Sequence, residues 1–92
     1  MDSEVERRLR IGEALCAARL EQGLSIEDIA SHTKVSTRYL NALECDNFSE
    51  LPSRVHALGF ARAFAKCVDL NSNEIAEAVK AHWIDPASRY PG

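Results

Sequence analysis

Apolar side chains recur along the chain every three or four residues, which is the repeat of a helix that buries one face. No stretch alternates apolar and polar residues for long enough to indicate a strand. We therefore predict an all-α fold of five helices, at about residues 4–22, 25–32, 36–45, 52–68 and 72–83. All of these helices contribute apolar residues to the predicted core: Ile11, Leu15, Ile29, Leu40, Leu43, Phe64, Val68, Ile75 and Val79.

Short polar residues, glycine and proline mark the expected helix ends. Gly23 suits a left-handed stop after the first helix. Ser25, followed three residues later by Asp28, has the pattern of a capping box. Ser36 offers a second cap. Pro52 is expected in the first turn of the fourth helix, because its missing N–H would have no partner there.

The chain is expected to form one domain, since 92 residues suffice for a single modest core. Asn71, with Glu74 three residues later, begins the last helix. The segment "DPASRYPG" that follows contains two prolines and a glycine, which stop a helix. We predict the domain over residues 1–85 and the start of a linker over residues 86–92.

The composition excludes several classes of protein. The acidic start "MDSEVE" lacks the basic flank of a signal peptide, and the longest apolar run is far too short to span a bilayer. Three cysteines without a C-x-x-C pair indicate reduced thiols in a cytoplasmic setting rather than disulfides or a zinc site. Cys16 and Cys67 are expected to be small buried residues, and Cys45 to be exposed.

Nothing in the sequence indicates catalysis. His32, His56 and His82 belong to three separate predicted helices. No carboxylate pair, Gly-rich phosphate loop or metal-ligand spacing accompanies them. The sequence therefore predicts a protein that is not an enzyme and has no cofactor or bound metal.

Residues 25–44 carry the most informative pattern, a short capped helix, the turn "TKV" and a second capped helix. Ala30 is small enough to let the two helices cross closely, and Ile29, Val35 and Leu40 can close the wedge between them. This pattern predicts a helix-turn-helix unit. It resembles the repressor-like helix-turn-helix family, in which the second helix enters the major groove of DNA.

DNA binding is one open alternative for this unit. The candidate DNA-binding residues all lie at or near the start of the second helix: Ser36, Thr37, Arg38 and Asn41. Two features disfavour it. Ile26 and Lys34 stand where such repressors commonly have a glutamine and a glycine. Residues 21–50 carry six acidic against two basic residues, whereas a phosphate-binding surface needs a basic stripe.

A second resemblance covers about residues 8–80. Gly12 and the segments "GLS", "YLNALE", "LPSRV", "GFARAFA" and "VDLNSNE" occur in that order. Together they resemble the N-terminal cytoplasmic domain of the RodZ family of bacterial cell-shape proteins. The resemblance implies that the domain binds the actin-like filament protein MreB. It also implies an inner membrane anchor, a single transmembrane helix beyond a linker and outside these residues, with this domain in the cytoplasm.

By the same resemblance, the partner surface is centred on the fourth helix, where the family carries two aromatic residues one turn apart. The matching positions here are His56 and Phe60. The helical spacing leaves Phe60 open to two interpretations, a core residue or one at the interface edge, whereas it favours the core for Phe64.

The charge of the fourth helix agrees with a partner that has an acidic surface. Residues 51–68 carry Arg54, Arg62 and Lys66 and no acidic residue. Aromatic rings buried in the interface with the partner would then supply binding affinity, and charged residues at the rim of that interface would steer the association. We predict Arg54 and Arg62 as partner-binding residues beside the two ring positions.

Overall fold

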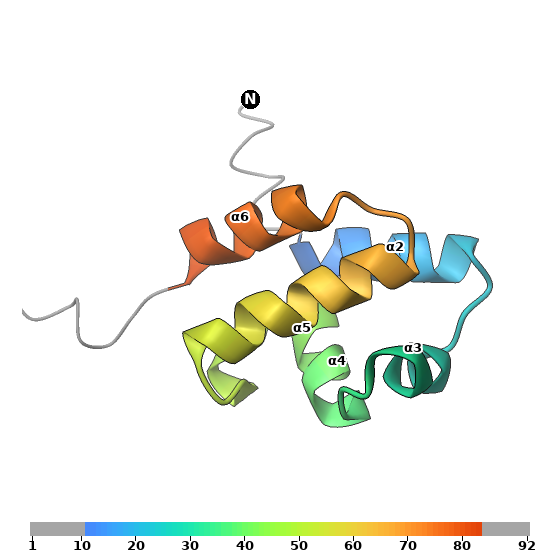
Figure 1. Ribbon diagram of the computed structural model, residues 1–92, viewed down its shortest axis with the longest axis horizontal. Coiled ribbons are helices and arrows are strands. Elements are labelled where there is room, and N and C mark those ends of the chain that lie inside the picture. Colours follow the sequence, from blue (N-terminus) through green and yellow to red (C-terminus); the bar gives the residue numbers. More distant parts are fainter. Residues whose placement is uncertain (1–10, 84–92) are drawn as a thin grey trace, which may run out of the picture.

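The computed structural model describes residues 11–83, and these residues contain helices and no strand (Figure 1). The helices are α2 (Ile11–Glu21), α3 (Ile26–Thr33), α4 (Thr37–Glu44), the short 3-10 helix η1 (Phe48–Glu50), α5 (Arg54–Cys67) and α6 (Ser72–His82). The predicted all-α class is thereby confirmed. The predicted start of the first helix at residue 4 and the predicted linker at 86–92 lie outside the described residues.

Helix α5 crosses the middle of the molecule (Figure 1). It packs along α6 on one side, and α3 and α4 pack against it on the other. Helix α2 packs against α4 and, less extensively, α6. The outward side of α5 thus lies between α6 and the helix-turn-helix pair α3–α4.

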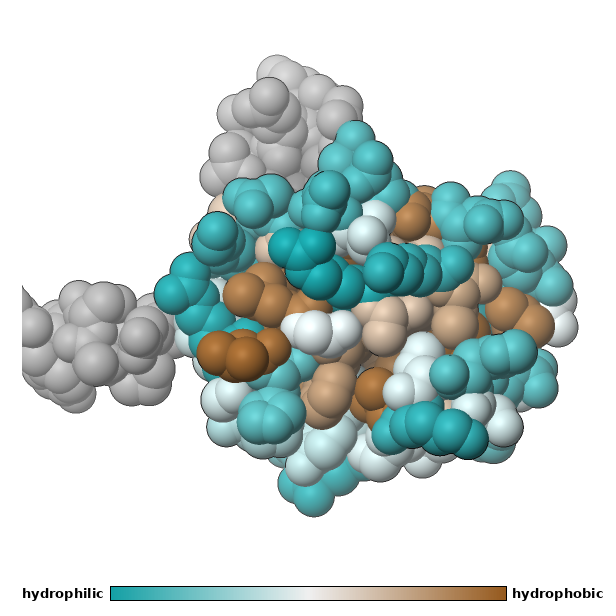
Figure 2. Space-filling view, in the orientation of Figure 1, coloured by the Kyte–Doolittle hydropathy of each residue, from teal (hydrophilic) through white to brown (hydrophobic). Residues whose placement is uncertain are grey.

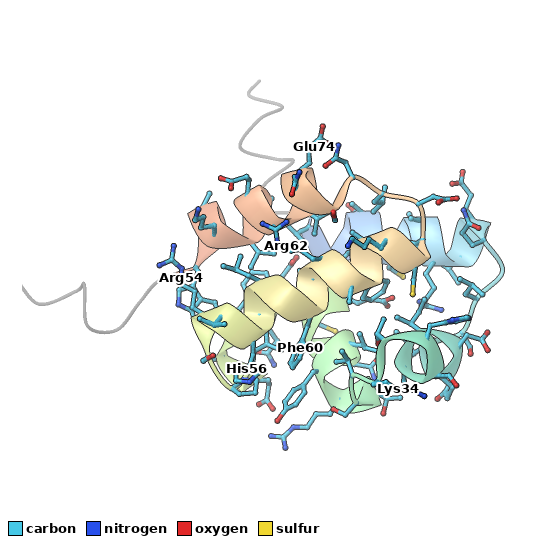
Figure 3. The ribbon with its side chains drawn as sticks, in the orientation of Figure 1. Lys34, Arg54, His56, Phe60, Arg62 and Glu74 are labelled. Carbon is cyan, nitrogen blue, oxygen red and sulfur yellow. The ribbon has the colours of Figure 1, made fainter. Side chains whose placement is uncertain are left out.

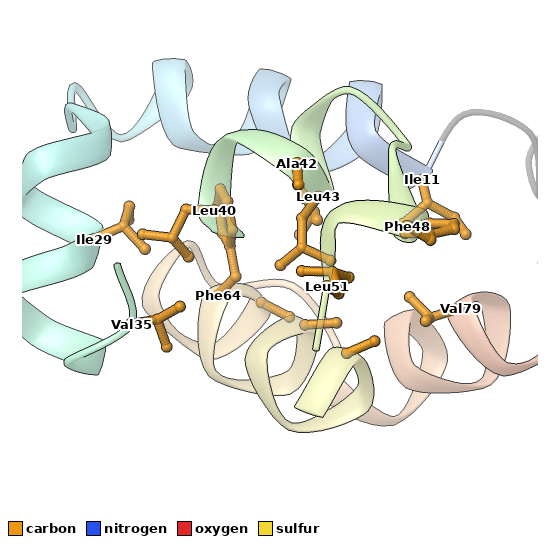
Figure 4. Close-up of a cluster of buried hydrophobic side chains, with 14 of the residues drawn as sticks. Ile11, Ile29, Val35, Leu40, Ala42, Leu43, Phe48, Leu51, Phe64 and Val79 are labelled. Carbon is orange, nitrogen blue, oxygen red and sulfur yellow. The ribbon is translucent and has the colours of Figure 1, made fainter. Parts of the chain in front are cut away.

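The core runs between these helices, and Phe64 of α5 is completely buried within it (Figure 4). The predicted core residues are all buried except Ile75, which is partly exposed at the edge of the core. The sequence pattern missed Phe48 and Leu51, which are buried as well. They belong to the connection between α4 and α5, where η1 turns apolar side chains inward without a helical repeat long enough to detect.

Several helix ends have the predicted caps. Gly23 takes the left-handed conformation, with φ of 71°. The Ser25 side chain accepts a hydrogen bond from the Asp28 N–H at 3.0 Å, and the Asp28 carboxylate accepts one from the Ser25 N–H at 2.9 Å. The Asn71 side chain accepts from the Glu74 N–H at 3.0 Å. These bonds satisfy backbone donors that the first turn of a helix leaves free.

Two helix starts differ in detail from the prediction. Ser36 is the N-cap residue of α4, as predicted, but its side chain makes no capping hydrogen bond. Pro52 lies outside α5, which begins at Arg54. Ser53 is the cap instead, because its hydroxyl accepts from the His56 N–H at 3.2 Å and so leaves Pro52 before the helix.

A close contact between α2 and the end of α4 positions the helix-turn-helix unit. A Cβ on Gly12 would lie 2.1 Å from the Glu44 carbonyl oxygen, so only glycine fits there. The Gly12 N–H donates to Asp46 Oδ1 at 2.8 Å. Farther along α2, Arg19 Nε lies 2.6 Å from Glu44 Oε2 and its Nη1 donates to the Leu24 carbonyl at 2.9 Å. Both side chains of this ion pair are mostly buried, and the hydrogen bond to Glu44 raises the pKa of the Arg19 guanidinium.

Candidate protein-interaction surface

Helices α3 and α4 form the predicted helix-turn-helix unit, joined by residues 34–36. Lys34 takes the left-handed conformation there, with φ of 63°, although it is not a glycine (Figure 3). Ile29, Val35 and Leu40 are buried between the helices, as predicted. The unit therefore has the geometry in which α4 would be the DNA-reading helix.

The candidate DNA-binding residues lie at the surface of α4 and the turn before it. Ser36, Arg38 and Asn41 are exposed and Thr37 is partly exposed. The guanidinium of Arg38, however, donates to Glu50 Oε1 from Nη2 at 3.0 Å and from Nε at 3.3 Å. This pair is exposed and individually weak, but it sets a carboxylate beside the arginine that would approach a phosphate.

His56 and Phe60 lie one turn apart on the flank of α5 that faces α4 (Figure 3). Their ring centroids are 5.7 Å apart, and the rings are tilted by 54°. His56 is exposed, and its Nδ1 lies 2.7 Å from the Ser53 hydroxyl oxygen. Phe60 is partly buried and packs against the core. Phe60 thus contacts the core and is also partly exposed at the surface, whereas Phe64 is a core residue.

Tyr39 of α4 completes an aromatic patch that we define as Tyr39, His56 and Phe60. The Tyr39 and Phe60 rings are stacked, with centroids 5.5 Å apart and planes 18° apart. The helical spacing of Tyr39, Leu40 and Leu43 would let Tyr39 face the core, but it is only partly buried. The sequence near Tyr39 does not tell whether its ring is buried in the core or stacked at the surface, because the stacking partner Phe60 belongs to another helix.

The two predicted arginines lie away from the aromatic patch. Arg62 is on the opposite flank of α5, where its Nη1 donates to Asn73 Oδ1 of α6 at 2.6 Å (Figure 3). Arg54 is exposed at the first residue of α5. Between the flanks lie Gly59, which is exposed, and Val55, whose surface is 77% exposed. The structure therefore places basic groups at the margins of this face and apolar groups between them.

We use the term α5 surface for the outward face of this helix, which has the following residues: Arg54, Val55, His56, Gly59, Phe60 and Arg62. In the space-filling view, apolar colours cross the middle of the molecule between hydrophilic margins (Figure 2). A large exposed aliphatic side chain beside one exposed and one partly exposed ring makes this face a candidate for binding a protein.

A family model described as a helix-turn-helix domain matches residues 14–75. The chain belongs to this helix-turn-helix family. This match confirms the fold predicted from residues 25–44 and extends it through α5 into the first turn of α6.

Two curated proteins are similar to this helix-turn-helix domain. It is 35% identical over 72 residues to the cytoskeleton protein RodZ of Streptococcus pneumoniae. It is 32% identical over 57 residues to the uncharacterized membrane protein YmfM of Bacillus subtilis. The matches cover 78% and 62% of this chain, but only 26% and 20% of those two proteins. No solved structure matches. The resemblance to RodZ that the motifs indicated is thereby confirmed.

The helix-turn-helix domain has neither a candidate metal site nor a candidate membrane span in the described residues. Across residues 11–83, no group of three or more His, Cys, Asp or Glu side chains could hold a metal ion. In the same range, no helix has the length and apolar character needed to cross a membrane.

Cys45 is exposed as predicted, whereas Cys16 and Cys67 are half-buried rather than buried. Burial raises the pKa of the Cys67 thiol, which makes it less reactive.

Proposed function

We propose that this chain is a non-catalytic interaction domain of a RodZ-like cell-shape protein. It binds the actin-like filament protein MreB, mainly through α5, and a membrane segment beyond the domain links that filament to the inner membrane from the cytoplasmic side. The similarity to the cytoskeleton protein RodZ supports the cytoskeletal role. The observation that carries the choice of surface is the exposed face of α5, where the His56 and Phe60 rings lie beside the exposed Val55.

The energetic argument rests on what a partner would bury. Phe60 already packs against the core on one side, so its ring is held in place and loses little conformational entropy on binding. His56 adds a flat ring next to it, with its orientation held by the Ser53 hydroxyl at 2.7 Å. Held aromatic rings of this kind are typical of the few residues that dominate the binding energy of an interface.

The charge argument concerns the partner. Arg54, Arg62 and Lys66 are exposed along α5, and residues 51–68 contain no acidic residue. Arg62 is oriented by Asn73, whose amide oxygen is neutral, so its positive charge is not cancelled there. Exposed cations at the margin favour a filament with an acidic surface and mainly raise the association rate.

The alternative function is a DNA-binding transcriptional regulator of the repressor-like helix-turn-helix family. Exposed Arg38 and Asn41 on α4 support it. The Arg38–Glu50 pair and the six acidic against two basic residues in 21–50 disfavour it, because both oppose the approach of phosphates. We expect duplex binding at physiological salt to be weak and unspecific. Nanomolar binding to one selected sequence, lost in Arg38→Ala or Asn41→Ala, would establish the alternative.

Co-sedimentation of the 92-residue chain with MreB filaments tests the proposed function. His56→Ala should weaken binding while leaving the thermal melt nearly unchanged, since the His56 side chain is exposed. His56→Tyr, which restores the ring type of the RodZ family, should strengthen binding. His32→Ala, a change of the same kind at an exposed position of α3, is the matched control and should bind like the parent.

Phe60→Ala and Arg62→Glu extend the test. Phe60→Ala should weaken binding strongly, but it needs a melting control because a partly buried phenylalanine also stabilises the fold. Arg62→Glu should slow association, and more strongly at low salt. If all the α5 variants co-sediment like the parent, α5 is not the binding surface.

A further inference from the structure

The aromatic patch is shared between two helices, and its α4 member has no part in the function proposed so far. We propose that Tyr39 belongs to the surface that binds the protein partner, so that the partner contacts α4 as well as α5. This inference rests on the proposed function, because it takes the partner to be the acidic filament protein that docks on the α5 surface.

Tyr39 packs against the edge of the core, but its ring is not fully buried. Leu40 and Leu43 supply the completely buried contacts of α4, whereas Tyr39 remains partly exposed. A tyrosine with one face packed and the rest of its surface partly exposed is well suited to an interface, where its ring offers apolar area and its hydroxyl a polar group.

Contacts between side chains join Tyr39 continuously to the α5 surface. Its ring is stacked on Phe60 at 5.5 Å, and Phe60 in turn meets His56 at 5.7 Å. On α4 itself, the Arg38 guanidinium lies 5.9 Å from the centroid of the Tyr39 ring, within the range of a cation–π contact. A partner that covers Phe60 therefore meets Tyr39 and Arg38 next, without crossing a gap.

A protein interface of ordinary size is larger than one face of α5 and therefore extends onto a neighbouring helix. Helix α5 has 14 residues. At a rise of 1.5 Å per residue and a width of about 10 Å, one face of such a helix covers roughly 200 Å². A stable interface takes about 800 Å² from each partner. Even allowing for the roughness of a side-chain surface, a partner docked on α5 must also contact a neighbouring helix.

The aromatic area of the two neighbouring helices, rather than their charge, favours α4 over α6. Toward α6 the partner would meet the exposed acidic residues Glu74 and Glu77, although Lys80 pairs with Glu77. Toward α4 it would meet Tyr39 and Arg38, residue types enriched among those that dominate binding energy. Glu50 offsets part of the Arg38 charge, but the aromatic area has no counterpart on the α6 side of the patch.

Tyr39→Ala and Tyr39→Phe in the 92-residue chain test this inference by co-sedimentation with MreB filaments. We expect Tyr39→Ala to weaken binding by about tenfold or more, the loss typical of an important interface residue. Tyr39→Phe keeps the stacked ring and should stay within a few-fold of the parent. Asn41→Ala is the control, because it removes an exposed side chain from a different face of the same helix.

Two further measurements separate a direct contact from an indirect one. If Tyr39 acts only by supporting Phe60, then Tyr39→Ala should have no effect in a Phe60→Ala background, as a double-mutant cycle would show. Hydrogen exchange of the unaltered chain avoids mutation altogether. Filament binding should protect amides of residues 37–41 as well as those of 54–62.

The outcomes also distinguish this inference from the proposed function. Absence of filament binding by the parent would overturn both. Loss of binding in His56→Ala and Phe60→Ala, with Tyr39→Ala like the parent and no protection of residues 37–41, would overturn only the role of Tyr39. If Tyr39→Ala impaired binding to a DNA duplex and not to filaments, α4 would serve nucleic acid and the inference would be wrong.

Discussion

Gly12→Ala should destabilise the protein strongly, because the new Cβ has no space. It would lie 2.1 Å from the Glu44 carbonyl oxygen and 2.7 Å from that of Leu43, and both are backbone atoms that can move only if α2 and α4 separate. Overpacking of this kind costs about 1–3 kcal/mol. Separation of the helices also stretches the 2.8 Å hydrogen bond from the Gly12 N–H to Asp46, which contributes about 1 kcal/mol or more.

Alanine recovers less than about 1 kcal/mol through its better helix propensity. The net loss should therefore be about 1–4 kcal/mol, out of the 5–15 kcal/mol that is usual for a domain, which lowers the Tm by about 4 °C or more. Urea unfolding followed by circular dichroism gives the free energy of unfolding directly.

Gly59→Ala is the matched control, since it makes the same chemical change in the middle of α5. A Cβ at Gly59 meets nothing within 4 Å, so alanine should stabilise the fold by about 0.5–1 kcal/mol. The two substitutions should thus shift the unfolding midpoint in opposite directions. A Gly12→Ala variant as stable as the parent would refute the close packing of α2 on α4 as the reason for this glycine.

Three other predictions concern the fold. Lys34→Gly should raise the free energy of unfolding by up to about 1 kcal/mol in urea titrations, because glycine adopts the left-handed φ of 63° without the penalty that lysine incurs. Phe64→Ala should cost about 3–5 kcal/mol and leave the chain largely unfolded at 37 °C by circular dichroism, since this ring is completely buried. Hydrogen bonds from the Ser25 N–H and hydroxyl lower the pKa of Asp28 below its ordinary value of 3.8. The carboxylate therefore stabilises the fold above that value and loses its effect as the pH falls through the lowered pKa, so the Tm difference between the parent and Asp28→Asn, measured from pH 7 to pH 2, should vanish in acid.

Much of the fold was predictable because it depends on residues close together in the sequence. A capping box such as Ser25–Asp28 spans three residues, and the buried face of each helix repeats every three or four. The position of Pro52 shows the limit of such local signals. Pro52 and Ser53 each carry a plausible signal for a helix start, and the pattern does not decide that the Ser53 hydroxyl reaches the backbone.

The candidate site was predictable only in part. The resemblance to the RodZ family indicated His56 and Phe60, and their spacing of one helical turn predicted that they lie side by side. The 5.7 Å between their ring centroids agrees with that prediction. Arg54 and Arg62 were predicted from charge alone, and the structure separates Arg62 from the rings on the opposite flank of α5. Their role in binding stays a prediction.

Hydrophobic periodicity tells which face of a helix is buried, but it carries no information about what that face packs against. The sequence by itself therefore determined the all-α class, the helix-turn-helix unit and the large apolar residues that the main helices contribute to the core. Only the tertiary structure brought Tyr39 of α4 onto Phe60 of α5, Glu50 onto Arg38, and the carbonyl of Glu44 onto Gly12. Each of these contacts joins residues of different elements, and each depends on how the helices cross, which packing of the whole core decides.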